Sequence, residues 1–161
     1  MKRSKLILVL LGLGLLIPSS LSAGTFLGVS QGLVATSLEI GILGRRAEQH
    51  IAFSLPLVRT EPENYFKAPS MSATISLRTL RFKPLVLSAG VKSQVSWEGS
   101  DGYIIGLGGT IALSYEFIKK GEVLFLEGSY LPLITTQGVL STDLGEQQLK
   151  QWIRLGYRHA F

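Results

Sequence analysis

Histidine, cysteine and paired acidic residues most often carry out chemistry in proteins, and this sequence is poor in them. It contains two histidines, His50 and His159, and no cysteine. A Ser–His–acid hydrolase needs its histidine within hydrogen-bond reach of a nucleophile and an orienting acid, and neither histidine stands in such a setting. Two separated histidines are also a poor metal site. We therefore expect no catalytic, cofactor-binding or metal site.

A second set of ionisable residues stands at alternate positions among apolar neighbours. Glu39 lies between Leu38 and Ile40, and Glu127 follows Leu126. Buried charges must be paired or hydrated, so acids and bases that share one face are expected to form a salt-bridge network. The predicted network comprises Glu39, Arg78, Lys92, Glu116, Glu127, Lys150, Arg154 and Arg158. A narrow polar conduit along the same face is the alternative.

The elements that position these charges are predicted to be β-strands, because apolar residues recur at every second position. The segment 103–117 is the clearest, with apolar and aromatic residues at odd positions and mostly small or polar residues at even positions. Aromatic residues at both ends of an apolar band are typical of membrane barrels. The residues predicted to face lipid include Leu85, Leu87, Tyr103, Ile105, Leu107, Ile111, Leu113 and Tyr115.

Similar alternation predicts further strands, and the connections between them differ in length. The other alternating segments are 34–42, 51–57, 70–78, 85–97 and 122–134. Short basic turns are expected at 44–49, 81–84 and 118–121. Longer or more polar loops are expected at 59–69 and 135–146, with a compact connection at 98–102 between them in order. If the C-terminus is periplasmic, the parity of the strands requires an additional turn near 30–32. The total is then about eight strands, of which the first is short.

The first 23 residues are typical of a cleaved secretory signal. Lys2, Arg3 and Lys5 precede an apolar run from Leu6 to Ile17, and Ala23 offers a small residue at the cleavage position. An uncleaved anchor is the alternative. The signal holds three of the 16 basic residues, which leaves 13 against 11 acidic residues and a net charge of +2. The expected mature domain, 24–161, has no basic cluster suited to nucleic acid.

The last eight residues resemble the assembly signal of outer-membrane barrels. That signal has a polar residue, a glycine, a bulky residue and a terminal aromatic residue at fixed spacing. The matching positions are Arg154, Gly156, His159 and Phe161, with Tyr157 between them. His159 departs from the pattern, because an apolar residue is more usual there. The resemblance implies recognition by the barrel-assembly machinery.

In length, topology and terminus the chain resembles the small eight-stranded outer-membrane proteins of bacteria. The resemblance implies an all-β fold, a transmembrane antiparallel up-and-down β-barrel. It also implies location in the outer membrane, with outer-membrane lipids as partners. The loops at 59–69 and 135–146 are the candidate contact sites for an extracellular partner. No functional residue can be transferred on this basis.

The function expected from the sequence is a structural or surface-interaction role without enzymatic activity. A narrow pore for ions or small solutes is one alternative. A lipid-modifying enzyme is another, because some small outer-membrane barrels are lipid A deacylases. The last alternative is a secreted soluble barrel with a ligand cavity.

Overall fold

The computed structural model describes residues 24–33, 35–56, 69–97, 103–117, 121–136, 139–141 and 153–161. The predicted signal peptide and most of the predicted loops lie outside these segments. The described residues form strands, turns and bends and contain no helix. In these segments, accordingly, there is no helix with the length and apolar character needed to cross a membrane.

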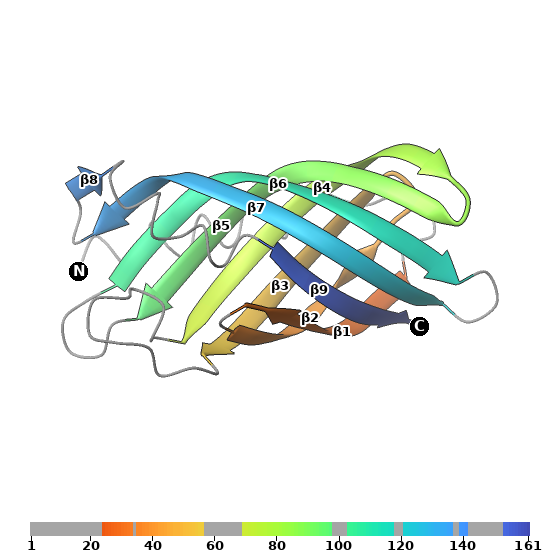
Figure 1. The fold of residues 1–161 in the computed structure, drawn as a ribbon, viewed down its shortest axis with the longest axis horizontal. Helices are drawn as coiled ribbons and strands as arrows, with labels where there is room; N and C mark the ends of the chain where they lie inside the picture. The colour runs from red at the N-terminus through yellow and green to blue at the C-terminus, as the bar shows by residue number, and fades with distance from the viewer. Residues whose placement is uncertain are drawn as a thin grey trace.

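The strands close into a barrel (Figure 1). Eight of them form the ring β6–β5–β4–β3–β2–β1–β9–β7, and pairing of β7 with β6 completes it. Every pairing is antiparallel, which confirms the prediction of an all-β antiparallel barrel. The strands are β1 (Gly24–Gly32), β2 (Ala35–Leu43), β3 (Ala47–Pro56), β4 (Ser70–Phe82), β5 (Leu85–Trp97), β6 (Tyr103–Phe117), β7 (Glu122–Thr136), β8 (Val139–Ser141) and β9 (Ile153–Ala160).

The wall of the barrel is taller on one side than on the other. Strands β4 to β7 have 13 to 15 residues, whereas β1, β2, β3 and β9 have 8 to 10. The eight strands of the ring meet at one end, on the right in Figure 1. We call it the turn end because the short connections at 44–46 and 83–84 lie there. The opposite end is called the loop end. Strands β5 to β7 and the small strand β8 reach farthest toward it.

The prediction for the first hairpin is wrong in position. A turn was expected near 30–32, but β1 continues to Gly32 and its partner β2 begins at Ala35. The physical reason is that side chains of β1 and β2 form hydrogen bonds with one another at this end of the hairpin. The Ser30 hydroxyl donates to Glu39 at 2.7 Å, and the Thr36 hydroxyl donates to Gln31 across the hairpin at 2.6 Å. The first strand is therefore nine residues long rather than short.

The turn predicted at 44–49 is also too long. Strand β3 begins at Ala47, so Glu48 lies within a strand and is buried. Its carboxylate accepts hydrogen bonds from Ser76 and Arg158 inside the barrel, at 3.2 and 3.3 Å. Because these partners compensate its charge, Glu48 can point into the barrel, and β3 can begin before it.

Two irregularities interrupt the ladders. The pairing of β4 with β5 shifts register after Arg78, where Thr79 is the extra residue. The pairing of β6 with β7 shifts between Leu107 and Gly109, opposite the segment of β7 that contains Pro132. Proline has no N–H to donate to a ladder, so it is found at bulges and edges of sheets. The side chains of β4 alternate between buried and more exposed positions up to Leu77, and the four residues beyond Arg78 are all exposed.

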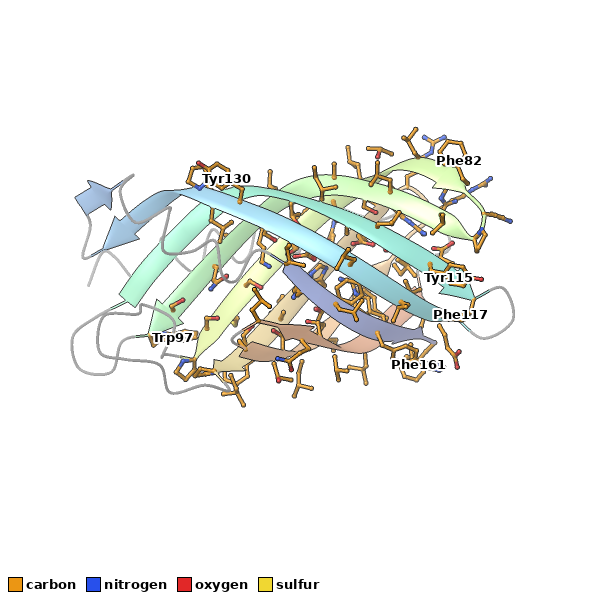
Figure 2. All side chains as sticks on the ribbon, in the orientation of Figure 1. Phe82, Trp97, Tyr115, Phe117, Tyr130 and Phe161 are labelled. Carbon is orange, nitrogen blue, oxygen red and sulfur yellow. The ribbon has the colours of Figure 1, made fainter. Side chains whose placement is uncertain are left out.

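The two faces of the wall differ sharply in polarity (Figure 2). Large apolar side chains are exposed on the outside, such as Leu38, Ile111 and Leu155. The buried side chains are mostly serine, threonine and charged residues. The interior of this barrel is therefore polar and its exterior apolar, the reverse of a water-soluble domain.

Candidate functional site

Six of the described charged residues inside the barrel form one continuous chain of alternating sign. The sequence of contacts runs Lys92–Glu127–Arg154–Glu39–Arg158–Glu48, and we call these six residues the lumen charge chain. They come from β5, β7, β9, β2 and β3, so the chain crosses the lumen. Each side chain is less than one tenth exposed. Three acids balance three bases, which satisfies the requirement that buried charges be paired.

Glu127 and Glu39 each bridge two cations. Glu127 lies 3.0 Å from the Lys92 ammonium group and 2.6 Å from the Arg154 guanidinium group. Glu39 lies 2.7 Å from Arg154 and 2.9 Å from Arg158. Arg154 therefore joins the two carboxylates, one on each side. Because charge-assisted hydrogen bonds are the strong ones, this arrangement fixes four strands relative to one another.

His50 is attached to the lumen charge chain and does not have the setting of a catalytic base. Its Nε2 atom lies 2.9 Å from Nη2 of Arg154. A guanidinium group has only donors, so Nε2 is the acceptor and the imidazole uses its one lone pair in this contact. A general base needs that lone pair for its nucleophile. His159 is half-buried at the turn end, where its ring meets Phe161 edge-on at 5.0 Å.

Two aromatic side chains inside the barrel were not anticipated from the sequence. Phe26 and Phe125 are buried, and the Arg158 guanidinium carbon lies 4.9 and 3.9 Å from their ring centroids. Each ring faces a glycine directly across the ladder, Gly41 and Gly156 respectively. A Cβ atom on Gly41 would lie 2.7 Å from the Phe26 ring, and one on Gly156 would overlap the Phe125 ring.

The signal for these rings was present in the sequence. Phe26 precedes Gly28 and Ser30, and Phe125 precedes Glu127 and Ser129, each at two-residue spacing. An aromatic residue that shares the phase of small and polar residues is expected to point inward with them. Its partner glycine belongs to another strand, so the pair itself cannot be recognised before the register is known.

The remaining residues of the predicted network behave differently. Arg78 and Glu116 form an ion pair nearer the turn end, and the Arg78 side chain also donates to the carbonyl of Gly44 at 3.0 Å. The Glu116 side chain is partly exposed. Lys150 lies outside the described residues. Glu48 belongs to the lumen charge chain although the sequence placed it in a turn.

The residues of the predicted assembly signal divide between the two faces of β9. Arg154 points inward, and Gly156 lies beneath the Phe125 ring. Tyr157 and Phe161 are exposed on the outer side.

Apart from Tyr103, the residues predicted to face lipid lie on the outer side of the wall. Ile111 is 60 % exposed, the most of this group. Leu87 and Ile105 are half-buried, and the side chain of Tyr103 is outside the described part. The other exposed members are Leu85, Leu107, Leu113 and Tyr115. Of the two candidate partner loops, only Pro69, the end of β7 and β8 are described.

The lumen toward the loop end is lined by small polar side chains. A cavity of about 30 Å³ lies there, bounded by residues that include Ser37, Ser54, Ser72 and Gln94 and, at the lumen charge chain, Lys92 and Arg154. This volume is enough for ordered water. The hydroxyl of Ser37 is 2.7 Å from that of Ser54.

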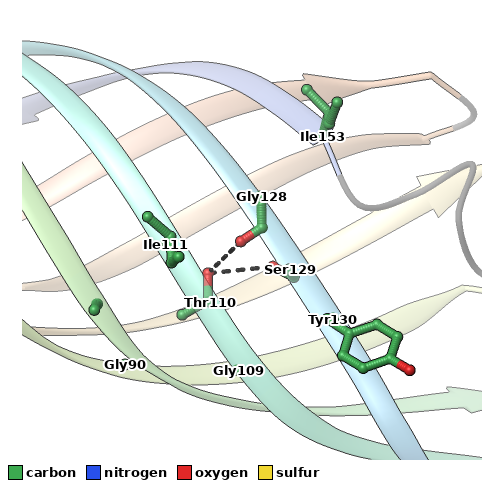
Figure 3. Close-up of a pocket in the computed structure, with 9 residues that line it drawn as sticks. Gly90, Gly109, Thr110, Ile111, Gly128, Ser129, Tyr130 and Ile153 are labelled. Carbon is green, nitrogen blue, oxygen red and sulfur yellow. Dashed lines mark hydrogen bonds between the residues drawn. The ribbon is translucent and has the colours of Figure 1, made fainter.

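A separate, apolar groove of about 530 Å³ lies on the wall (Figure 3). It forms where small residues replace large ones on β5, β6 and β7, and the Thr110 hydroxyl donates to the Gly128 carbonyl at 3.2 Å beneath it. The lining offers hydrocarbon contacts and no charged side chain. The lining residues are Ala89, Gly90, Gly109, Thr110, Ile111, Gly128, Ser129, Tyr130 and Ile153.

Comparison with known proteins gives no match to a protein-family model, a curated protein or a solved structure. Within the described segments, no three histidine or acidic side chains gather closely enough to hold a metal ion.

Proposed function

We propose that this chain is an integral outer-membrane β-barrel with a structural role in the envelope and no enzymatic activity. The observation that carries the proposal is the inverted polarity of a closed barrel. Exposed Leu, Ile, Val and aromatic side chains surround the wall, while serine, threonine and charged side chains fill the interior. Water disfavours such an exterior, whereas a closed ring of strands pairs its backbone groups internally, as a bilayer requires.

The arrangement of aromatic side chains supports the same proposal. Figure 2 places Phe82, Tyr115, Phe117 and Phe161 near the turn end, with aliphatic side chains along the wall beyond them. Toward the loop end, Trp97 and Tyr130 are exposed on the outside. Aromatic residues at the two boundaries of an apolar band suit the interfaces of a membrane.

The lumen charge chain supports a structural role rather than conduction. In a barrel of eight strands the interior is just wide enough to be filled by side chains. Here six charged side chains and the rings of Phe26 and Phe125 lie across it, joined by contacts of 3.3 Å or less between the charges. A solute would have to separate buried ion pairs in order to pass.

Cell fractionation combined with heat-modifiable gel migration tests the location and the barrel together. We expect the protein in the outer-membrane fraction, and we expect the unheated sample to migrate differently from the boiled one. Release into the periplasm without detergent would instead support a soluble barrel and contradict the proposal.

Planar-bilayer recording tests the closed lumen. The protein should insert without producing discrete current steps. Stepwise currents from the wild-type protein would favour the narrow pore.

Mass analysis of cell lipids tests the enzyme alternative. A lipid product that disappears from a deletion strain would favour the enzyme.

A further inference from the structure

Four exposed basic residues are gathered at the turn end. Arg45 and Arg46 form the connection between β2 and β3, and Arg81 and Lys83 lie where β4 turns into β5. Both sites adjoin the same stretch of β4, because the backbone N–H of Arg78, three residues before Arg81, donates to the carbonyl of Arg46 at 2.8 Å. We call these four residues the basic rim.

The structure beneath the basic rim fixes its position while leaving its charges available. The Arg78 side chain reaches the carbonyl of Gly44, so it joins β4 to the β2–β3 turn a second time. Among the described residues, no ion pair includes a member of the basic rim. The nearest acid on β6, Glu116, is engaged by Arg78. Glu122, at the start of β7, accepts a hydrogen bond from Tyr157.

The basic rim is the outermost of three layers along the wall. Leu80 is exposed on the outer side of β4, and Phe82 follows it at 71 % exposure, with Lys83 next in the chain. Figure 2 shows nitrogen-bearing side chains beside Phe82 at this end. Apolar, aromatic and basic groups therefore follow one another toward the end of the barrel, the order in which a bilayer presents hydrocarbon, interface and head groups.

We propose that the basic rim binds the head groups of anionic phospholipids in the leaflet that surrounds the turn end. This inference rests on the proposed function, because it requires the barrel to lie in a membrane. Anionic lipid surfaces attract clustered Lys and Arg residues, and an arginine fork matches the geometry of a phosphate group. The apolar and aromatic layers below would hold the acyl chains of the same lipids. A soluble anion would use only the charges and leave those layers without a role.

Lipid selectivity, measured by electron paramagnetic resonance, tests this inference on the protein reconstituted in phosphatidylcholine vesicles. Trace amounts of spin-labelled phosphatidylglycerol or phosphatidylcholine report the fraction of each lipid that the protein restrains. We expect phosphatidylglycerol to be preferred about fivefold at low ionic strength, and high salt should weaken that preference.

Paired variants identify the residues responsible. The double variants Arg45→Gln with Arg46→Gln, and Arg81→Gln with Lys83→Gln, should each reduce the preference severalfold. The matched control is Arg59→Gln with Lys67→Gln, which removes the same charge from the segment joining the loop ends of β3 and β4. The control should keep the wild-type preference, and gel migration should show that all variants are folded.

Three results would overturn the inference. The first is equal association of both lipids with the wild-type protein, and the second is an equal loss of preference in the control, which would indicate a net-charge effect. The third is suppression by inorganic phosphate beyond that by chloride at equal ionic strength, which would indicate a site for free anions. A protein that inserts without lipid preference contradicts only this inference, whereas one that does not insert contradicts the proposed function as well.

Discussion

The inner and outer faces of β6 place adjacent residues of one strand in opposite surroundings, one buried in the barrel and one exposed on its outside. Ile111 and Leu113 on the outside are exposed, while Ala112 and Ser114 between them are buried. The outer residues share an apolar or aromatic character. Inner residues of the barrel are matched to particular neighbours, as Glu127 is to Lys92 and Arg154 and the Phe125 ring is to Gly156. The difference teaches that the outer face tolerates exchange within a chemical class, whereas the inner face depends on particular neighbours.

Among changes on the two faces of the wall, removing the carboxylate of Glu127 from the inner face should reduce the free energy of unfolding the most. Glu127→Ala leaves Lys92 and Arg154 without their shared partner inside the barrel. We expect the free energy of unfolding to fall by about 3–5 kcal/mol, because an uncompensated buried charge is costly. Urea titration in lipid vesicles, followed by gel migration, measures the change.

The matched control for that experiment is Glu127→Gln, which keeps the shape and the hydrogen-bonding oxygen but removes the charge. We expect a smaller loss than for alanine. If Glu127→Ala were as stable as the wild type, the lumen charge chain would not hold the strands together.

A charge placed on the outer face should be the next most damaging change. Leu113 is 46 % exposed on the outside. Leu113→Arg should cost about 2–4 kcal/mol if the site lies near the middle of the bilayer, and Leu107→Arg should behave alike. Leu113→Ile, which keeps the apolar character, should leave the urea midpoint almost unchanged. Equal stability of the arginine and isoleucine variants would contradict the assignment of this face to hydrocarbon.

Shortening an interior ring should have an intermediate effect. Phe125→Leu removes the aromatic face that lies 3.9 Å from the Arg158 guanidinium carbon. We expect a loss of about 2 kcal/mol, the size of a desolvated cation–π contact. The same urea titration measures this loss. Phe125→Tyr would keep the ring but add a hydroxyl group that needs space near Gly156, so Phe125→Leu reports the contribution of the ring more clearly. No loss would show that Arg158 does not depend on the ring.

A conservative substitution on the inner face should have the smallest effect on the free energy of unfolding. Thr110→Ser keeps the hydroxyl that donates to the Gly128 carbonyl and removes only a methyl group. The loss should stay below about 1 kcal/mol, near the value for one buried methylene. A loss as large as that of Leu113→Arg would contradict the expectation that this inner position tolerates the removal of one methyl group.

The alternation of residues was sufficient to predict the barrel and most strands, because a period of two sets which residues share a face. It also placed Glu39, Lys92 and Glu127 together on the inner side. The partners within the lumen charge chain could not be predicted. They depend on how far each strand is shifted along its neighbour, which the pattern within one strand does not contain.

The sequence-based prediction is wrong in two regions, because it relied on local residue preferences. Glu48 was assigned to a turn because it lies among charged residues after Gly44, whereas Arg158, more than 100 residues away, stabilises it within β3. The first hairpin was placed two or three residues early, because Ser30, Gln31 and Gly32 are typical turn residues. In both regions contacts with another strand outweighed the local preference.

Accessibility of side chains along β6 tests the central claim most directly. The chain has no cysteine, so single cysteines at Leu107, Ile111 and Leu113, and at Thr110, Ala112 and Ser114, can each carry a nitroxide label in vesicles. We expect the first three labels to collide with oxygen dissolved in the bilayer and to be protected from a water-soluble nickel reagent, and the second three to show less contact with oxygen. Accessibility that does not alternate, or labels at Leu107, Ile111 and Leu113 that are reached from water, would contradict the assignment of the two faces.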